Sequence, residues 1–118
     1  MSEKQFNWYK LADNINEIPF QENKLAEVIV DGKTICLVKR EDQIFACTQK
    51  CPHAGGHLVE GFIDIHGSIV CPLHRYRFNP ETGRNISGEG YFLKTYKVEL
   101  REDGVYIGFE KSKGLFGW

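Results

Sequence analysis

Four residues in the middle of the chain could bind metal, and they occur as two similar pairs. Cys51 and His53 flank Pro52, and seventeen residues, 54–70, separate His53 from the second pair, Cys71 and His74. Each pair supplies one thiolate sulfur and one imidazole nitrogen, both of which are common metal ligands. Residues two apart in an extended segment point to the same side, so Cys51 and His53 can face one site.

The residues around these pairs favour tight loops. Pro52 and Pro72 each follow a cysteine, where proline fixes one backbone angle and removes an N–H donor. Gly55, Gly56 and Gly61 follow the first pair and allow the backbone to turn sharply or to approach a cofactor closely. We therefore expect two loops that present sulfur and nitrogen to one site.

Two thiolates and two imidazoles fit two kinds of metal site. One is a tetrahedral zinc, and the other is a two-iron cluster with one iron bound by sulfur and the other by nitrogen. Structural zinc sites favour longer ligand spacings than the Cys-x-His of the first pair. Two ligands this close strain a single zinc, whereas a cluster offers two irons. The residues favour the cluster but leave the zinc site as an alternative.

In the rest of the chain, apolar and polar residues alternate as in short strands that are separated by turns. Asp31-Gly32 and Asp103-Gly104 are hairpin signals, and no segment has a convincing helical period, although a short helix within 14–18 is compatible with the sequence. Cys36 and Cys47 lie in apolar strands and are predicted to be buried thiols. The predicted strands are 8–12, 24–30, 33–39, 43–48, 67–70, 76–79, 96–101 and 105–109.

These strands predict a single all-β domain over residues 1–118. Both ends of the chain, 1–45 and 91–118, would form a base, and the segment 46–90, which is dense in Gly, Pro, His and Cys, would be inserted into it. The four candidate ligands all lie in this inserted segment.

Composition excludes several classes of partner. The chain has a net charge of −1 and no run of Lys and Arg, so neither a nucleic acid nor a membrane is expected as a partner. No stretch approaches the ~20 apolar residues that span a bilayer. The N-terminus lacks the apolar core of a secretory signal, so we expect a cytoplasmic protein whose thiols stay reduced.

The ligand pattern resembles the Rieske motif, in which Cys-x-His is followed at a similar separation by Cys-x-x-His. The start of the chain, 8–19, and its end, 96–107, also resemble the base of that family. Further matches in the first and second loops are Gly56, Leu58, Gly61, Phe78, Thr82 and Gly83.

The resemblance implies a Rieske-like antiparallel β-sandwich base with an inserted cluster-binding subdomain of two ligand loops. It implies one [2Fe–2S] cluster per chain, with Cys51 and Cys71 on the inner iron and His53 and His74 on the outer iron. The implied function is that of a ferredoxin, which passes single electrons from a flavin-dependent reductase to a terminal oxygenase or similar enzyme. Such a protein is an electron-transfer component and is not by itself a catalyst.

The chain departs from the high-potential members of this family. Two cysteines that form a disulfide there are replaced here by Gly56 and Leu73, and a Ser and a Tyr that donate hydrogen bonds to sulfur are replaced by Tyr76 and Phe78. Fewer donors stabilise the extra electron less, so we expect a potential in the lower part of the range of about −150 to +300 mV. Arg75 replaces a residue that is usually Gly.

Two alternatives stay open. The resemblance also extends to the small subunit of assimilatory nitrite reductase, which would make the large subunit of that enzyme the partner. The second alternative is a zinc-binding module. A self-contained oxygenase is not expected, because only 44 residues follow His74 and the predicted base uses them.

Overall fold

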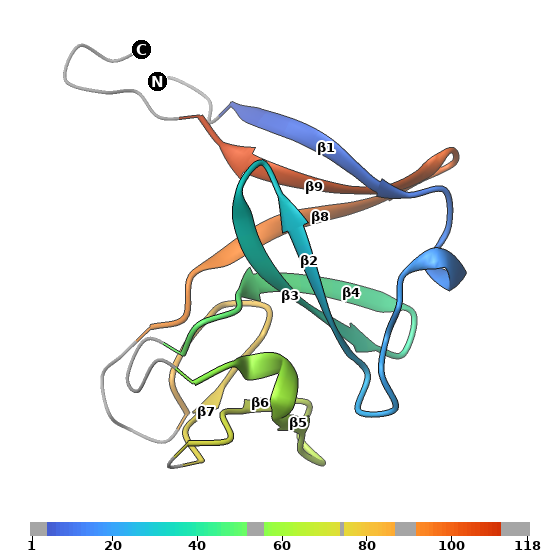
Figure 1. Ribbon diagram of the computed structural model, residues 1–118. Coiled ribbons are helices and arrows are strands. Elements are labelled where there is room, and N and C mark those ends of the chain that lie inside the picture. The colour runs from blue at the N-terminus through green and yellow to red at the C-terminus, as the bar shows by residue number, and fades with distance from the viewer. Residues whose placement is uncertain (1–4, 52–55, 74, 87–91, 112–118) are drawn as a thin grey trace, which may run out of the picture.

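The computed structural model describes residues 5–51, 56–73, 75–86 and 92–111 (Figure 1). No helix within these ranges is long and apolar enough to cross a membrane. The described residues form strands β1 (Phe6–Ala12), β2 (Leu25–Val30), β3 (Lys33–Arg40), β4 (Gln43–Thr48), β5 (Phe62–Ile63), β6 (Ile69–Val70), β7 (Arg77–Phe78), β8 (Thr95–Arg101) and β9 (Gly104–Glu110), with two short 3-10 helices, η1 (Ile15–Glu17) and η2 (Leu58–Glu60).

Six of the strands form one antiparallel sheet in the order β1-β9-β8-β4-β3-β2. Among the described residues, its two halves join only where β4 meets β8, through the pairs Ala46↔Tyr96 and Cys47↔Thr95. Figure 1 shows the consequence: β1, β9 and β8 form one layer, and β2, β3 and β4 cross beside it. The predicted antiparallel β-sandwich base is therefore confirmed.

The first hairpin turn is formed by the residues that the sequence predicts, whereas the second is shifted by one residue, with Glu102 and Asp103 in the turn and Gly104 at the start of β9. Asp31 and Gly32 connect β2 to β3 with φ angles of 50° and 77°. Positive φ at both central residues matches the right-handed twist of the flanking strands. The strand boundaries around this turn agree with the prediction to within one residue.

Strand β3 is buried on both of its faces. Ile35 and Leu37 point into a core shared with β9, whereas Cys36 and Val38 point into a second core. Successive side chains of a strand alternate between faces, so burial of four consecutive residues requires a layer on each side. The second layer is the β5–β7 unit, which we define as residues 56–73 and 75–86.

The predicted burial of the two cysteines outside the ligand pattern is confirmed. Cys36 and Cys47 are both fully buried and face each other across β3 and β4. The Cys47 thiol lies 3.7 Å from the Cys36 carbonyl oxygen, to which it donates. Interaction with the Cys36 side chain, together with burial, raises the pKa of Cys47 well above its usual range. A neutral thiol in such surroundings is chemically inert.

The β5–β7 unit contains strands shorter than the sequence suggests. The prediction of strands over 67–70 and 76–79 holds only for Ile69–Val70 and Arg77–Phe78, while β5 and η2 were not predicted. These elements have two or three residues each, which is too short for a periodic pattern. They persist because Leu58, Ile69 and Phe78 are buried in the core shared with β3.

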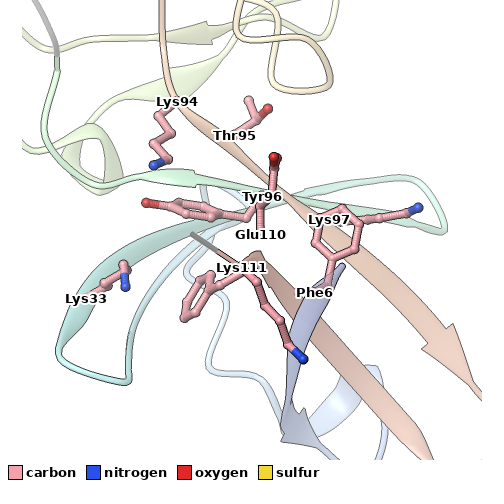
Figure 2. Close-up of a pocket in the computed structure, with 10 residues that line it drawn as sticks. Phe6, Lys33, Lys94, Thr95, Tyr96, Lys97, Glu110 and Lys111 are labelled. Carbon is pink, nitrogen blue, oxygen red and sulfur yellow. The ribbon is translucent and has the colours of Figure 1, made fainter. Parts of the chain in front are cut away.

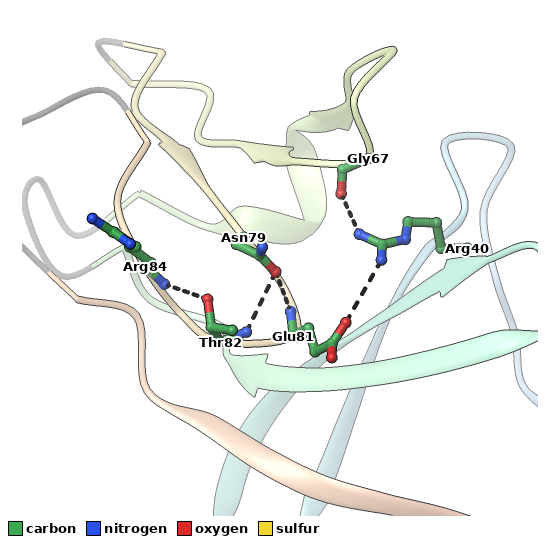
Figure 3. A network of polar contacts seen from close by, with 6 residues as sticks. All are labelled: Arg40, Gly67, Asn79, Glu81, Thr82 and Arg84. Atoms are coloured by element: carbon green, nitrogen blue, oxygen red, sulfur yellow. Dashed lines mark hydrogen bonds and ion pairs between the residues drawn. The ribbon is translucent and has the colours of Figure 1, made fainter.

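Polar side chains attach this unit to the base. Arg40, at the end of β3, donates to the Gly67 carbonyl oxygen at 3.1 Å and approaches the Glu81 carboxylate at 3.9 Å, as Figure 3 shows. Its guanidinium group also lies 4.8 Å from the ring centroid of Phe45. The exposed ion pair adds little by itself, so the carbonyl contact and the packing carry most of this attachment.

A turn organised by Asn79 follows β7. The Asn79 side-chain oxygen accepts hydrogen bonds from the backbone N–H groups of Glu81 and Thr82 (Figure 3). The turn ends at Gly83, which has a φ of 79° and accepts a hydrogen bond from the Leu93 backbone N–H. A Cβ atom at Gly83 would overlap the Leu93 carbonyl oxygen.

We predict that Gly83→Ala destabilises the protein much more than Gly32→Ala. Both glycines have positive φ, but a Cβ at Gly32 meets nothing within 4 Å. Gly32→Ala should therefore cost only the ~1–2 kcal/mol of a left-handed residue with a Cβ. Gly83→Ala adds a backbone clash, for a total of about 3 kcal/mol or more. Urea unfolding followed by circular dichroism measures both, and equal losses would contradict the clash.

Candidate metal centre

The two candidate cysteines begin loops of the same construction. The backbone N–H of Cys51 donates to the Gly56 carbonyl oxygen, and that of Cys71 donates to the Tyr76 carbonyl oxygen, both at 2.8 Å. In each case the residue before the cysteine pairs with the residue after the loop end, as Lys50↔His57 and Val70↔Arg77. Each loop is thus the tip of an antiparallel hairpin, closed five residues after its cysteine. We call these the first and second ligand hairpins.

The cysteine thiols of both hairpins are buried and lie together. Cys51 is 2% exposed and Cys71 is fully buried, and neither takes part in a disulfide. Burial raises the pKa of Cys71 to about 11, and interaction with the Cys51 thiol adds to the rise. A backbone hydrogen bond from Leu73 acts in the opposite direction because it favours the thiolate.

The second ligand hairpin contacts the first one through Gly56 and Leu73. A Cβ at Gly56 would lie 3.1 Å from Leu73 Cγ and 3.3 Å from the Cys71 sulfur. The absence of a side chain at Gly56 therefore lets the two hairpins approach each other. These are also the two positions at which the sequence resemblance expects a disulfide in high-potential relatives, and the structure places them in contact.

The structure brings together part of the predicted ligand set. The Cys51 and Cys71 side chains lie in one core and interact, whereas His53 and His74 lie outside the described residues, so the ligand set stays a prediction. Within the described ranges, no group of three or more His, Cys, Asp or Glu is arranged to hold a metal ion. His57, the remaining histidine near the site, is exposed and pairs with Lys50 at the base of the first hairpin.

Three of the positions at which the sequence departs from the Rieske pattern lie in or beside the second hairpin. Phe78 is fully buried in the same apolar core as both ligand cysteines, and Tyr76 packs against that core. Arg75 is exposed and has a φ of 56°, in the left-handed region that favours glycine. That backbone conformation explains why Gly would be the usual residue at the position of Arg75.

Sequence reasoning missed a side chain that positions the first hairpin. Gln49 is only 3% exposed, accepts a hydrogen bond from the Val59 N–H at 2.8 Å and donates to the Glu27 carboxylate at 3.0 Å. Asn23 acts from the other side, where it donates to the carbonyl oxygens of Val59 and Gly61. No local pattern marks either residue, because both act across long sequence separations.

The donor set fits a two-iron cluster better than a disulfide or a catalytic thiol. Two free thiols lie side by side at the tips of matched hairpins, and a backbone donor already favours the thiolate form of one of them. Metal binding requires deprotonated sulfur, and such second-sphere hydrogen bonds support it. Each hairpin also carries one of the two histidines inside its loop.

We predict that the double variant Gly56→Cys/Leu73→Cys forms a disulfide between the hairpins. The 3.1 Å between a Cβ at Gly56 and Leu73 Cγ matches the ~3 Å between a Cβ and the far sulfur of a disulfide. Closing a loop of this size should add about 3 kcal/mol of stability under oxidising conditions.

Thiol titration of the unfolded double variant, before and after reduction, tests for that bond. Gly56→Ser/Leu73→Ser is the control, since it has a similar volume and cannot form the bond. Urea midpoints under oxidising and reducing conditions should differ for the cysteine pair only. A full count of free thiols without reductant would contradict the contact between Gly56 and Leu73.

Comparison with known proteins identifies the family. The model of the Rieske [2Fe–2S] domain matches residues 7–97. The ferredoxin component of a naphthalene 1,2-dioxygenase system from Pseudomonas aeruginosa is 35% identical over 92 residues, which is 77% of this chain and 86% of that protein.

Solved structures agree with this assignment. A chain from the complex of reduced oxygenase and oxidized ferredoxin in carbazole 1,9a-dioxygenase is 30% identical, with a TM-score of 0.73 over 89% of this chain and 95% of that one. The putative NADH-dependent nitrite reductase small subunit from Mycobacterium tuberculosis shares the fold, with a TM-score of 0.77, 16% identity and coverage of 92% and 99%. The chain therefore belongs to the Rieske [2Fe–2S] domain family, whose cofactor is a [2Fe–2S] cluster.

Proposed function

We propose that this protein is a one-electron carrier, the ferredoxin component of an oxygenase system. The observation that carries the proposal is the pair of matched ligand hairpins, which bring the buried Cys51 and Cys71 thiols together. In the proposed ligand set, Cys51 and Cys71 hold the inner iron and His53 and His74 hold the outer iron. The bound cluster would supply a site that accepts and releases single electrons.

The protein would keep water away from the sulfur side of this site. Leu58, Ile69, Phe78 and Leu93 are fully or almost fully buried in the core that contains both cysteines. A largely apolar surrounding disfavours added negative charge, which lowers the reduction potential. The two hairpins and the β3–β4 face behind them would hold the thiolates in fixed positions.

The surface around the hairpins suits brief contact with a redox partner. Leu73, Ile86 and Phe92 are 46%, 49% and 70% exposed; Leu73 lies in the second ligand hairpin, and the Ile86 N–H donates to the Arg77 carbonyl oxygen at the base of that hairpin. Small exposed apolar patches with charged neighbours such as Arg75 are typical of transient interfaces. We propose a flavin-dependent reductase and a terminal oxygenase as the partners.

The wider organisation is part of the same proposal. Residues 1–45 and 91–118 would act as the base, and 46–90 as the cluster-binding subdomain. A cytoplasmic location fits a carrier that meets a reductase and an oxygenase in turn. The similarity to relatives named as ferredoxin components over most of their length supports this assignment.

The second candidate function is that of a small Rieske subunit of a larger oxidoreductase such as assimilatory nitrite reductase. Its support is the shared fold, since the small-subunit structures are only 21% and 16% identical. The ferredoxin relatives are more similar in sequence, so we favour the free carrier. Size-exclusion chromatography from the native source separates the two, because a subunit elutes in a stable stoichiometric complex.

We predict that His53→Ala and His74→Ala each abolish the visible spectrum of the cluster. The purified wild-type protein should contain two irons and acid-labile sulfide, and its reduced form should give the electron paramagnetic resonance signal of a mixed-ligand [2Fe–2S] cluster. Redox titration should fit a single one-electron step. A colourless protein with one zinc would contradict the whole proposal.

Two further variants control for general damage to the fold. Cys51→Ser should lose the cluster, whereas Cys47→Ser, which changes a buried cysteine in the same core, should keep it at a cost in stability alone. Loss of the spectrum in Cys47→Ser with an unchanged unfolding midpoint would argue against the assigned ligands.

We also predict that Phe78→Tyr raises the reduction potential. The added hydroxyl can donate a hydrogen bond in the core that holds both ligand cysteines, and donors to sulfur stabilise the reduced form. The wild-type potential should lie in the lower part of the range of about −150 to +300 mV. Spectroelectrochemical titration of Phe78→Tyr, with Phe78→Leu as control, measures the change, and a lower potential in Phe78→Tyr would refute the argument.

A further inference from the structure

A basic groove lies on the six-stranded sheet, and neither ligand cysteine lines it. It has a volume of about 570 Å³ and is bordered by the ends of β1, β8 and β9 and by the start of β3 (Figure 2). Lys33, Lys94, Lys97 and Lys111 line it, and Glu110 is the one acidic residue that the described part of the chain contributes to its lining. Four lysines in one groove are a strong local excess in a protein whose net charge is −1.

Three of these lysines have their ammonium groups over aromatic rings. The ammonium group of Lys33 lies 4.8 Å from the ring centroid of Phe109, and that of Lys97 lies 5.3 Å from that of Phe6. Lys94 lies 5.7 Å from the ring centroid of Tyr96. Among the described residues, no ion pair forms at these three lysines. Their charges therefore remain available to a ligand.

A second hollow lies between the groove and the first ligand hairpin, since it has lining residues from both. This hollow of about 540 Å³ shares Lys33 and Tyr96 with the groove, and it is also lined by Lys50 and His57. Lys50 directly precedes Cys51 and pairs with His57. The carboxylate of Glu27 also lines this hollow but accepts a hydrogen bond from Gln49. Lys33 and Lys50 thus outnumber Glu27 in the hollow beside the hairpin that carries Cys51.

We propose that this groove binds an acidic peptide segment of the electron-transfer partner. The lysines come from separate elements and line one groove (Figure 2), which suits several carboxylates better than one small anion. The rings of Tyr96 and Phe6 can pack against an apolar side chain of the segment. Lysine is a strongly hydrated point charge, which gives fast, salt-dependent association and fixes the orientation of the partner.

This inference rests on the proposed function, because the groove orients a partner relative to the ligand hairpins. Binding at the groove would leave the hairpin tips free to face the partner's own redox centre. The partner would then be recognised by residues that lie outside the ligand hairpins.

The test compares Lys33→Gln/Lys97→Gln with the control Lys24→Gln/Lys39→Gln, both as holoproteins. The control removes the same charge, and Lys39, like Lys33, has its ammonium group over an aromatic ring. The probe is a fluorescein-labelled peptide rich in glutamate with one tyrosine, and its binding is followed by fluorescence polarisation. We expect the groove variant to bind about tenfold more weakly, or about 1.4 kcal/mol, and the control less than about twofold more weakly.

Equal weakening in both variants would overturn the proposal, since it would show a general charge effect. Competition by inorganic tripolyphosphate at the same concentration as the unlabelled peptide would also overturn it, in favour of a phosphate-bearing ligand. Carbodiimide coupling of the peptide should map to Lys33, Lys94, Lys97 and Lys111 and spare Lys24 and Lys39. Redox titration of each variant tests the proposed electron-carrier function independently of peptide binding, because these lysines do not bind the cluster. Absence of a one-electron step would contradict the carrier function, whereas peptide binding tests the groove alone.

Discussion

The packing of two hairpin tips against each other and against one face of β3 and β4 is the contact on which the site depends. Each tip is closed by a backbone hydrogen bond from its own cysteine, so the position of each thiol follows from the position of its hairpin. The bare backbone at Gly56 allows Leu73 and the Cys71 sulfur to approach it. If that contact opened, the two thiols would separate, and a shared metal centre could not form.

The base makes this contact possible because β3 serves two cores. Its Ile35 and Leu37 belong to the sandwich, and its Cys36 and Val38 belong to the layer that contains the ligand cysteines. The hairpins therefore rest on a strand that is buried on both of its faces. Polar contacts from Asn23, Gln49 and Arg40 then fix the orientation of this layer.

Two regions of the molecule contribute different parts of the proposed function. The ligand hairpins supply sulfur in apolar surroundings, which tunes the electron affinity of the site. The lysine groove supplies long-range attraction and orientation, which determine how often a partner arrives correctly placed. Electron transfer between proteins needs both, because a transient complex has a small interface and little time to search for its orientation.

The sequence by itself determined the features that depend on neighbouring residues. Alternation predicted most strands of the base, Asp31-Gly32 predicted a hairpin, and the spacing of cysteine and histidine pointed to a two-iron centre that the family comparison confirmed. Strand periodicity and turn chemistry act within a few residues, so they can be recognised in the chain itself.

Only the tertiary structure decided the features that join distant segments. No pattern of neighbouring residues in the sequence indicates that the two hairpins are built alike, that Gly56 contacts Leu73 or that Gln49 positions the first hairpin. The lysine groove likewise assembles residues from both ends of the chain and from β3. Such neighbours are chosen by the burial of apolar faces and by hydrogen bonds across long loops, and these depend on how the layers pack rather than on the order of residues.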